Sequence, residues 1–235
     1  MTDTVSSRQA VLAAITIGQA PRTDITHDIL PLMPPGMTLR EYGALDDYTL
    51  EEIQAQFSPQ PGDEVLVSRM RDGRQAHFAD RYIIPLVQQK IDQAEAEGAD
   101  AVILFCTGYF PPFRHRGLFL EPQPLLHAVA SKLVDGKKIG LLVPMPDQVQ
   151  QGRESWGRSG LSVEIACASP YLDFEKIKEA AATFRDKDLA FVCADCMGYS
   201  AEMKAAIHDI TGLPVLLPRT LVMRVLSELF TYFPS

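Results

Sequence analysis

The sequence predicts an α/β protein of two similar lobes, each a mainly parallel sheet flanked by helices, with the site in the interlobe cleft. Short apolar runs alternate with segments of helical period, the pattern typical of parallel α/β units. The pattern Cys-x-Gly-Tyr occurs at 106–109 and again at 196–199, each time just after an apolar run. We therefore expect each lobe to place a cysteine beyond the carboxyl end of a strand, where open α/β sheets bind ligands.

The length of 235 residues is suited to one large or two small lobes, and no linker or low-complexity tract divides the chain. We expect residues 1–118 together with 213–235 to form the first lobe and residues 119–212 to form the second. In this interpretation the C-terminal segment returns to complete the first lobe.

Apolar runs and turn-forming residues define the elements of the first half. The wholly apolar run AVILFC at 101–106 predicts a central strand. Arg71-Asp72-Gly73 is typical of a turn between two strands, and Gly98 is typical of a helix end. The expected strands are Val11–Ile17, Met37–Tyr42, Glu64–Met70, Gln75–Phe78 and Ala101–Cys106, and the expected helices are Tyr48–Phe57 and Asp80–Glu97.

The second half repeats this alternation. Pro144 predicts the end of one strand and Gly212 the end of one helix. The expected strands are Lys138–Val143, Leu161–Ala166, Leu189–Ala194 and Pro214–Leu217, and the expected helices are Pro124–Leu133, Asp147–Trp156, Phe174–Phe184, Ala201–Thr211 and Thr220–Phe230.

Composition excludes several classes of protein. Acidic residues outnumber basic residues 30 to 22, which gives a formal net charge of −8. This charge argues against a nucleic-acid partner, because a general binder of phosphate backbones carries a basic face. No apolar run approaches the roughly eighteen residues of a membrane span, so we expect no membrane partner.

The N-terminal region admits two interpretations. Arg8, the apolar stretch at 10–17 and the small residues at 18–20 resemble a signal peptide and its cleavage site. The stretch is short and rich in strand-forming residues, and Pro21 follows at once, so a first buried strand is favoured. The four cysteines are also too few and too clustered for a secreted disulfide framework. We therefore expect a cytoplasmic protein.

The cysteines are the candidate catalytic groups. Cys167 and Cys193 lie inside expected strands and are interpreted as buried hydrophobic residues. Cys106 and Cys196 stand at strand ends, where a glycine two residues later lets the backbone turn and brings N–H groups near the thiol, lowering its pKa from about 8.5 toward neutrality. Two thiols facing one cleft can take a proton from one face of a carbon and return one to the other, a racemisation or epimerisation without a cofactor. The alternative is that both are ordinary strand-end cysteines.

Metal and cofactor motifs are absent from the sequence. Cys193 and Cys196 form a Cys-x-x-Cys, but the first lies within a strand, their odd spacing sends the side chains to opposite faces, and no second pair is present. The five histidines show no metal-ligand spacing, and Gly18 alone makes no dinucleotide fingerprint. We expect no metal and no cofactor.

The end of the first strand offers groups for an anion. Gly18 permits a tight turn, and Thr23 or Asp24 is expected to cap a following helix. Arg22 is expected to clamp a substrate carboxylate, the alternative being a solvated side chain. The basic clusters at 69–74 and 114–116 could also gather an anionic substrate, but solvated loops are the favoured interpretation.

Several segments together resemble the AroM family, over roughly residues 11–229. They are Thr16-Ile17-Gly18-Gln19 with Pro21-Arg22 and Asp24, Arg71-Asp72-Gly73, Cys106-Thr107-Gly108, Val143-Pro144 with Gln148 and Trp156, Asp195-Cys196-Met197-Gly198, and Gly212-Leu213-Pro214-Val215. More distantly, the layout is similar to the aspartate/glutamate racemase superfamily, which includes hydantoin racemases, maleate isomerases and arylmalonate decarboxylases. Those enzymes have two similar α/β lobes with a catalytic cysteine in both lobes or in one.

This resemblance implies roles for individual residues. Cys106 matches the cysteine of the first lobe and Cys196 that of the second, and Thr107 matches the hydroxyl residue that helps to hold a carboxylate. Met197 departs from the pattern, because the superfamily usually has threonine there, which leaves a one-cysteine isomerase or decarboxylase open. The residues expected to bind substrate are Gly18, Gln19, Arg22, Thr107, Gly108, Met197 and Gly198.

The expected function is therefore cofactor-independent cysteine acid/base chemistry, of the racemase, isomerase or decarboxylase kind, on a small carboxylate. The alternative is a non-enzymatic protein that binds or senses a small anion on the same scaffold. A homodimer is compatible with either expectation.

Overall fold

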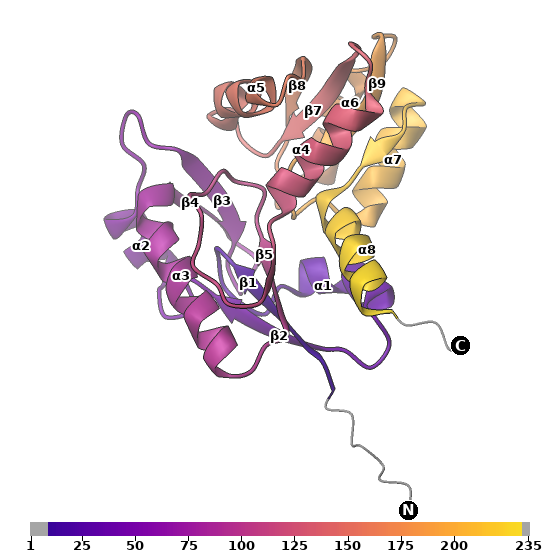
Figure 1. Ribbon diagram of the computed structural model, residues 1–235. Helices are drawn as coiled ribbons and strands as arrows, with labels where there is room; N and C mark the ends of the chain where they lie inside the picture. The colour runs from indigo at the N-terminus through magenta and orange to yellow at the C-terminus, as the bar shows by residue number, and fades with distance from the viewer. Residues whose placement is uncertain (1–8, 232–235) are drawn as a thin grey trace, which may run out of the picture.

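Two four-stranded parallel sheets organise the molecule (Figure 1). In this computed structural model, which describes residues 9–231, the first sheet has the order β2-β1-β5-β6 and the second has the order β10-β9-β7-β8. Their strands are β1 (Val11–Thr16), β2 (Thr38–Gly43), β5 (Ala101–Phe105), β6 (Leu118–Leu120), β7 (Lys138–Val143), β8 (Val163–Cys167), β9 (Leu189–Ala194) and β10 (Val215–Leu216). The predicted α/β fold with two parallel sheets is confirmed.

Helices cover both faces of the first sheet. Along β1, Ala13 and Ile15 pack in the core formed with α2 (Leu50–Gln56) and α3 (Asp80–Ala96). Leu12 and Ala14 point the other way, toward α1 (Thr23–Ile29) and α8 (Pro218–Phe230). This division follows from the two-residue period of a strand, and both faces read as apolar because both are buried.

The second sheet is covered in the same manner. Leu142 and Val192 face the core formed with α6 (Phe174–Ala182) and α7 (Ala201–Thr211). Leu141 and Cys193 face α4 (Pro122–Leu133) and α5 (Gln148–Arg158). Cys193 is fully buried, as the sequence predicts, and Cys167 is half-buried at the end of β8.

An antiparallel hairpin of β3 (Val65–Arg69) and β4 (Gln75–Ala79) forms a separate two-stranded sheet in the first half of the chain. Its turn at 70–74 is the one predicted from Arg71-Asp72-Gly73, and Gly73 there has a φ of 94°, a left-handed conformation that suits glycine. The hairpin places one strand edge against the second lobe, where it contributes to the site.

The C-terminal segment joins both parts of the molecule. β10 pairs with β9 in the second sheet, whereas α8 supplies Val222, Met223 and Leu226 to the core on one face of the first sheet. Figure 1 shows α8 beside α1, far from it in sequence. The predicted lobe boundaries at 118 and 213 remain predictions, and residues 1–8 and 232–235 of the predicted first lobe, Arg8 included, lie outside the described residues.

The first helix begins differently from the prediction. Arg22 is the N-cap residue of α1, and no side chain caps the helix, so the expected cap by Thr23 or Asp24 is wrong. Asp24 instead turns its carboxylate back to the Arg22 guanidinium, with Nη2 2.8 Å from Oδ2. The three-residue strand β6 and the short 3₁₀ helix at Leu30–Leu32 are too brief to show a period and were not predicted.

Candidate active site

The candidate site lies where β5 and β9, one from each sheet, reach their carboxyl ends. β5 ends at Phe105, so Cys106 follows at once, and β9 ends two residues before Cys196. The Thr107 hydroxyl donates to the backbone carbonyl of Asp195 across 3.2 Å, which ties the two strand ends together. Each cysteine therefore follows the carboxyl end of a parallel strand, as the sequence predicts.

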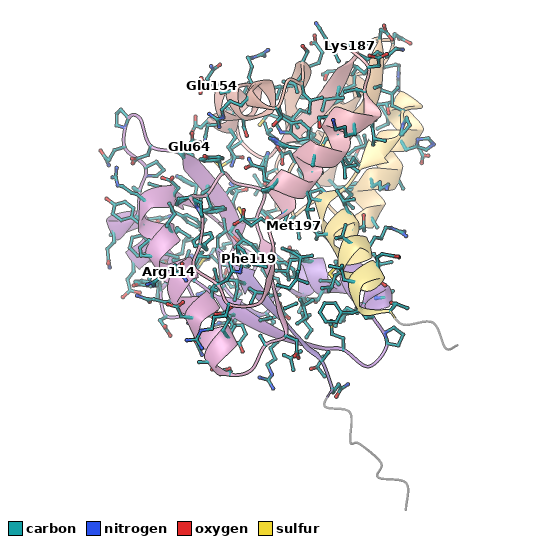
Figure 2. All side chains as sticks on the ribbon, in the orientation of Figure 1. Glu64, Arg114, Phe119, Glu154, Lys187 and Met197 are labelled. Atoms are coloured by element: carbon teal, nitrogen blue, oxygen red, sulfur yellow. The ribbon has the colours of Figure 1, made fainter. Side chains whose placement is uncertain are left out.

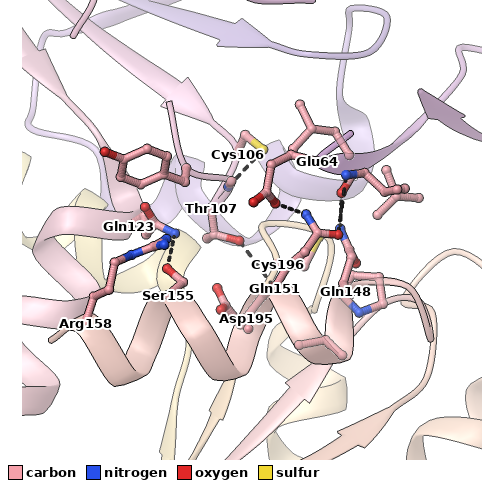
Figure 3. A pocket seen from close by; sticks show the side chains of 18 residues that line it. Glu64, Cys106, Thr107, Gln123, Gln148, Gln151, Ser155, Arg158, Asp195 and Cys196 are labelled. Carbon is pink, nitrogen blue, oxygen red and sulfur yellow. Dashed lines mark hydrogen bonds between the residues drawn. The ribbon is translucent and has the colours of Figure 1, made fainter. Parts of the chain in front are cut away.

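Both thiols belong to the wall of one small cavity (Figure 3). Its wall is formed by residues 64–67, the loop 106–109, α5 and residues 195–196. The free volume is about 70 Å³. About 10–15 Å³ of such volume holds one water molecule, so the cavity has room for about five to seven groups of that size. A cavity of this size fits a small organic acid.

Cys106 is half-buried at the turn after β5. The Gly108 N–H donates to its Sγ across 3.2 Å. A Cβ at position 108 would approach the Leu66 side chain to 2.7 Å, so glycine allows the hairpin to lie against this loop. Burial raises the pKa of the Cys106 thiol to about 12, and the Gly108 N–H opposes that effect only in part.

Cys196 has a richer set of partners. The Gly198 N–H donates to its Sγ across 3.4 Å, and Oη of Tyr171 lies 3.5 Å from the same sulfur. Burial raises the pKa of Tyr171, so its hydroxyl keeps the proton that it can donate to Sγ. A Cβ at position 198 would lie 2.6 Å from the Tyr171 ring, which is why this position needs glycine.

Burial also raises the pKa of Cys196, although the hydrogen bonds from Tyr171 and Gly198 and the charge of Arg22 act against it. The predicted fall of both thiol pKa values toward neutrality is therefore wrong. The N–H groups are present as expected, but loss of solvation outweighs them at both positions.

Arg22 lies behind Tyr171 and outside the cavity wall. Its guanidinium donates to both carboxylate oxygens of Asp24, to the hydroxyls of Thr16 and Ser68, and to Oη of Tyr171. These five contacts use all five N–H groups of an arginine, so none is left over for a substrate carboxylate. In this geometry Arg22 orients Tyr171 and places positive charge near Cys196.

Other residues predicted to bind substrate also lie outside the wall. Gln19 donates to the carbonyls of Leu45 and Tyr48 and accepts from the N–H of Arg71, so both ends of its amide hold loops. Gly18 permits close approach of the hairpin, since a Cβ there would lie 2.7 Å from the carbonyl oxygen of Arg69. Of the predicted site residues, the structure brings four to the cavity wall: Cys106, Thr107, Gly108 and Cys196.

Met197 and Gly198 follow Cys196 within the protein interior. The Met197 carbonyl accepts hydrogen bonds from the fully buried guanidinium of Arg219, with Nε 2.8 Å away. Arg219 also pairs with Asp28, Nη1 to Oδ2 2.8 Å, and so connects α8, α1 and the Cys196 loop. Sequence reasoning missed Arg219 because nothing near it in the chain indicates these partners.

The two basic clusters do not reach the cavity wall. Arg71 and Arg74 form exposed ion pairs with acidic residues of the first lobe, and Arg114 lies within 3.5 Å of Asp92. The favoured interpretation of both clusters as solvated loops fits these positions.

Asp195 is a functional candidate that sequence reasoning did not select. Its Oδ2 accepts from the indole N–H of Trp156 across 2.7 Å, while its Oδ1 is buried and accepts no hydrogen bond from the described residues. Burial raises the pKa of this carboxyl to about 6, and the hydrogen bond from Trp156 opposes the rise only in part. The available signal was an aspartate placed directly before a strand-end cysteine.

Two glutamines of α5 connect the second lobe to the hairpin edge. Gln148 Nε2 donates to the Val65 carbonyl across 3.1 Å, and Gln151 Oε1 accepts from the Val65 N–H across 3.3 Å. Gln151 also donates to the Glu64 carboxylate (Figure 3). These contacts give hydrogen-bond partners to the backbone at the edge of β3, and the residues that make them form one side of the cavity.

Figure 2 shows side chains filling the space between the ribbons of the two lobes.

Within residues 9–231 no group of three His, Cys, Asp or Glu side chains is arranged to hold a metal ion. In the same part of the chain no helix has the length and apolar character needed to cross a membrane.

Comparison with known proteins finds solved structures of the same fold. The chain is similar to the maleate isomerase Iso from Pseudomonas putida S16 (TM-score 0.65, 11% identity, 94% of this chain and 92% of that chain) and to the aspartate racemase of Picrophilus torridus (0.62, 14%, 93% and 93%). It is also similar to a liganded arylmalonate decarboxylase variant (0.63, 12%, 94% and 92%). At these identities the similarity shows a shared fold.

No curated protein matches the chain. The family model described as AroM protein matches residues 12–230, which includes both sheets and both cysteine loops. The chain, which has a racemase-like fold with two parallel sheets, therefore belongs by its sequence to the AroM protein family.

Proposed function

We propose that this protein is a cofactor-independent cysteine acid/base enzyme that moves protons at a carbon beside a carboxylate of a small acid. The observation that carries the proposal is the presence of two thiols, from two separate strand ends, on the wall of one small cavity. The fold shared with a racemase, an isomerase and a decarboxylase supports this class of reaction.

In the proposed step, the Cys196 thiolate takes the proton from carbon, and the electron pair of the C–H bond moves into an enolate whose charge rests on the carboxylate oxygens. The Cys106 thiol then gives its proton to the opposite face of that carbon and becomes a thiolate. We assign the base to Cys196 because Tyr171, Gly198 and Arg22 all favour its thiolate. The loop 106–109, which lines the cavity, is expected to hold the carboxylate.

Acid and base groups alone do not account for such a reaction. One well-placed group contributes about 10²–10⁴-fold, and the remainder must come from stabilising the enolate charge. The cavity suits this task because it is small and lies between the hairpin edge, the loop 106–109 and α5, and partial removal from water strengthens hydrogen bonds to a developing charge.

A reaction on one face only would need a single thiol. Cys196 and Asp195 are adjacent on the cavity wall, and the free Oδ1 of Asp195 can receive or return a proton there. A one-cysteine isomerase or decarboxylase would use this pair and leave Cys106 without a proton-transfer role.

The second candidate function is a sensor or carrier that binds a small anion without chemistry. The raised pKa values of both thiols favour it, because they leave little thiolate at neutral pH. For the enzyme to act at neutral pH, formation of the thiolate would have to depend on the bound substrate.

Deuterium exchange distinguishes these candidates. The wild-type protein is incubated in D₂O with aspartate, glutamate and 2-substituted malonates, and NMR follows loss of the proton on the acidic carbon. We expect exchange with at least one acid, lost in the Cys106→Ala/Cys196→Ala double variant and retained in Cys167→Ala, which changes a cysteine outside the cavity wall.

Exchange that persists in the double variant would contradict the mechanism. Thermal stabilisation by one of these acids without any exchange would favour the binding protein instead.

A further inference from the structure

A buried arginine of α8 holds the loop that follows Cys196. Arg219 is fully buried, and its Nε and Nη2 both donate to the carbonyl of Met197, which lies beside the start of α8 (Figure 2). Its Nη1 donates to the Asp24 carbonyl and to the Asp28 carboxylate, each across 2.8 Å. The Met197 carbonyl therefore receives two of the four hydrogen bonds that this guanidinium donates.

The position of Arg219 is unfavourable by each local criterion. The guanidinium is removed from water, and this burial lowers its pKa in spite of the negative charges of Asp28 and Asp24. Arg219 is also the second residue of α8, which begins at Pro218, and a cation in the first turn of a helix opposes the helix dipole. Residues that break several local preferences at once tend to mark functional sites. The contacts of Arg219 therefore indicate a role beyond packing.

The peptide group between Met197 and Gly198 connects this arginine to the candidate base. A trans peptide group is planar, so its C=O and its N–H point in opposite directions. Here the C=O faces the guanidinium of Arg219, and the Gly198 N–H donates to Sγ of Cys196 across 3.4 Å. Holding the oxygen with two N–H groups therefore also holds the N–H against the sulfur. A positive charge beside the oxygen polarises the same peptide and strengthens its N–H as a donor.

We propose that Arg219 is a positioning residue for Cys196, which holds and polarises the peptide 197–198 so that the Gly198 N–H stabilises the Cys196 thiolate. The use of that thiolate as a base rests on the proposed function, but the reactivity of the thiol can be measured without catalysis. Cys106 is the internal reference, because the Gly108 N–H makes the same contact with its sulfur and Arg219 makes its hydrogen bonds elsewhere.

Alkylation by iodoacetamide over a series of pH values tests this role, with peptide mass spectrometry to follow each cysteine. The midpoint of the profile measures the pKa of the thiol, whereas the plateau at high pH measures access of the reagent. In Arg219→Gln the midpoint of Cys196 should rise by about one pH unit, the effect of about one hydrogen bond to a charged group, while that of Cys106 stays. Arg219→Lys keeps the charge without the planar pair of N–H groups, so its midpoint should lie between wild type and Arg219→Gln.

Asp28→Asn is the matched control for damage to the buried junction. It breaks the same ion pair and should lower the free energy of unfolding, but it leaves the guanidinium on the Met197 carbonyl. The Cys196 midpoint should therefore not rise in this variant. Arg224→Gln, which changes an exposed arginine of the same helix, should alter neither stability nor midpoint.

An unchanged Cys196 midpoint in Arg219→Gln, an equal rise in Asp28→Asn, or an equal shift at both cysteines would overturn the inference. If Arg219→Gln does not fold, Arg219→Lys decides, and a midpoint equal to that of the wild type would overturn it. Lack of deuterium exchange in a wild-type protein whose Cys196 midpoint depends on Arg219 would contradict the proposed function alone.

Discussion

The two Cys-x-Gly-Tyr segments have the same local design but different surroundings. In each, a glycine N–H two residues along contacts the cysteine sulfur, at 3.2 Å for Cys106 and 3.4 Å for Cys196. The tyrosines then differ: Tyr109 is 59% exposed, whereas Tyr199 is fully buried and donates to the Ala168 carbonyl. The first segment faces the entrance of the site, and the second is part of the protein core.

This difference extends to the groups behind each thiol. Cys196 has the Tyr171 hydroxyl and, beyond it, the Arg22 guanidinium, whereas Cys106 has only its own loop N–H and the distant charge of Arg22 as favourable influences on a thiolate. An internal repeat therefore predicts where two residues meet, but long-range contacts decide which of them is the better base. We infer a division of work in which Cys196 removes the proton and Cys106 delivers one.

The largest expected effect separates the two cysteines. Cys196→Ala should reduce deuterium exchange by about 10³-fold or more, within the range for loss of one general base. Cys106→Ala should keep exchange on one face while losing inversion of configuration. NMR for exchange and chiral chromatography for configuration measure the two outcomes, and equal losses in both variants would contradict the asymmetry.

A smaller effect concerns the residue that precedes each cysteine, which is apolar Phe105 in the first lobe and Asp195 in the second. The raised pKa of Asp195 means that the folded protein prefers the protonated acid, so the contribution of this residue to stability should be lost as pH rises from about 4 through 6. Asp195→Asn should remove that loss and leave the variant more stable at pH 7 by about 2–3 kcal/mol, while the amide oxygen still accepts from Trp156.

Urea unfolding of both proteins at pH 4 and pH 7 measures this difference. Phe105→Leu, on the other lobe, is the control and should leave the pH dependence as in the wild type. A change in stability between these pH values that is the same in Asp195→Asn and in the wild type would contradict the assignment.

The smallest expected effect tests the Tyr171 contact. Tyr171→Phe removes a hydroxyl that favours the Cys196 thiolate and should raise the pKa of that thiol, slowing its alkylation by iodoacetamide about tenfold at a fixed pH, the effect of about one hydrogen bond. The pH dependence of alkylation of Cys106, followed by peptide mass spectrometry in the same samples, is the internal control. A shift of equal size at both cysteines would show that the hydroxyl acts on the whole cavity.

Local patterns predicted most of the scaffold. The strands β1, β5, β7 and β9 are short apolar runs, and helices such as α3 and α7 end at glycines, so their positions follow from nearby residues. The position of Cys106 and Cys196 on the cavity wall was also predictable, because each follows the carboxyl end of a parallel strand, where α/β sheets bind ligands.

What sequence reasoning missed depends on contacts between distant residues. Tyr171 reaches Cys196 only through the placement of the loop after β8. The charge of Arg22 indicated a substrate clamp, but Asp24, Thr16, Ser68 and Tyr171 already receive its N–H groups. The thiol pKa values likewise depend on burial, which no short motif records.

The position of α8 has a consequence for how the protein is made. The face of the first sheet formed by Leu12, Ile103 and Phe105 is covered by Val222, Met223 and Leu226 of that helix. During synthesis this face, which α1 covers only in part, stays partly exposed until α8 has left the ribosome. Nascent chains stalled before α8 should therefore be bound by chaperones that recognise exposed apolar surface, whereas chains that include it should not.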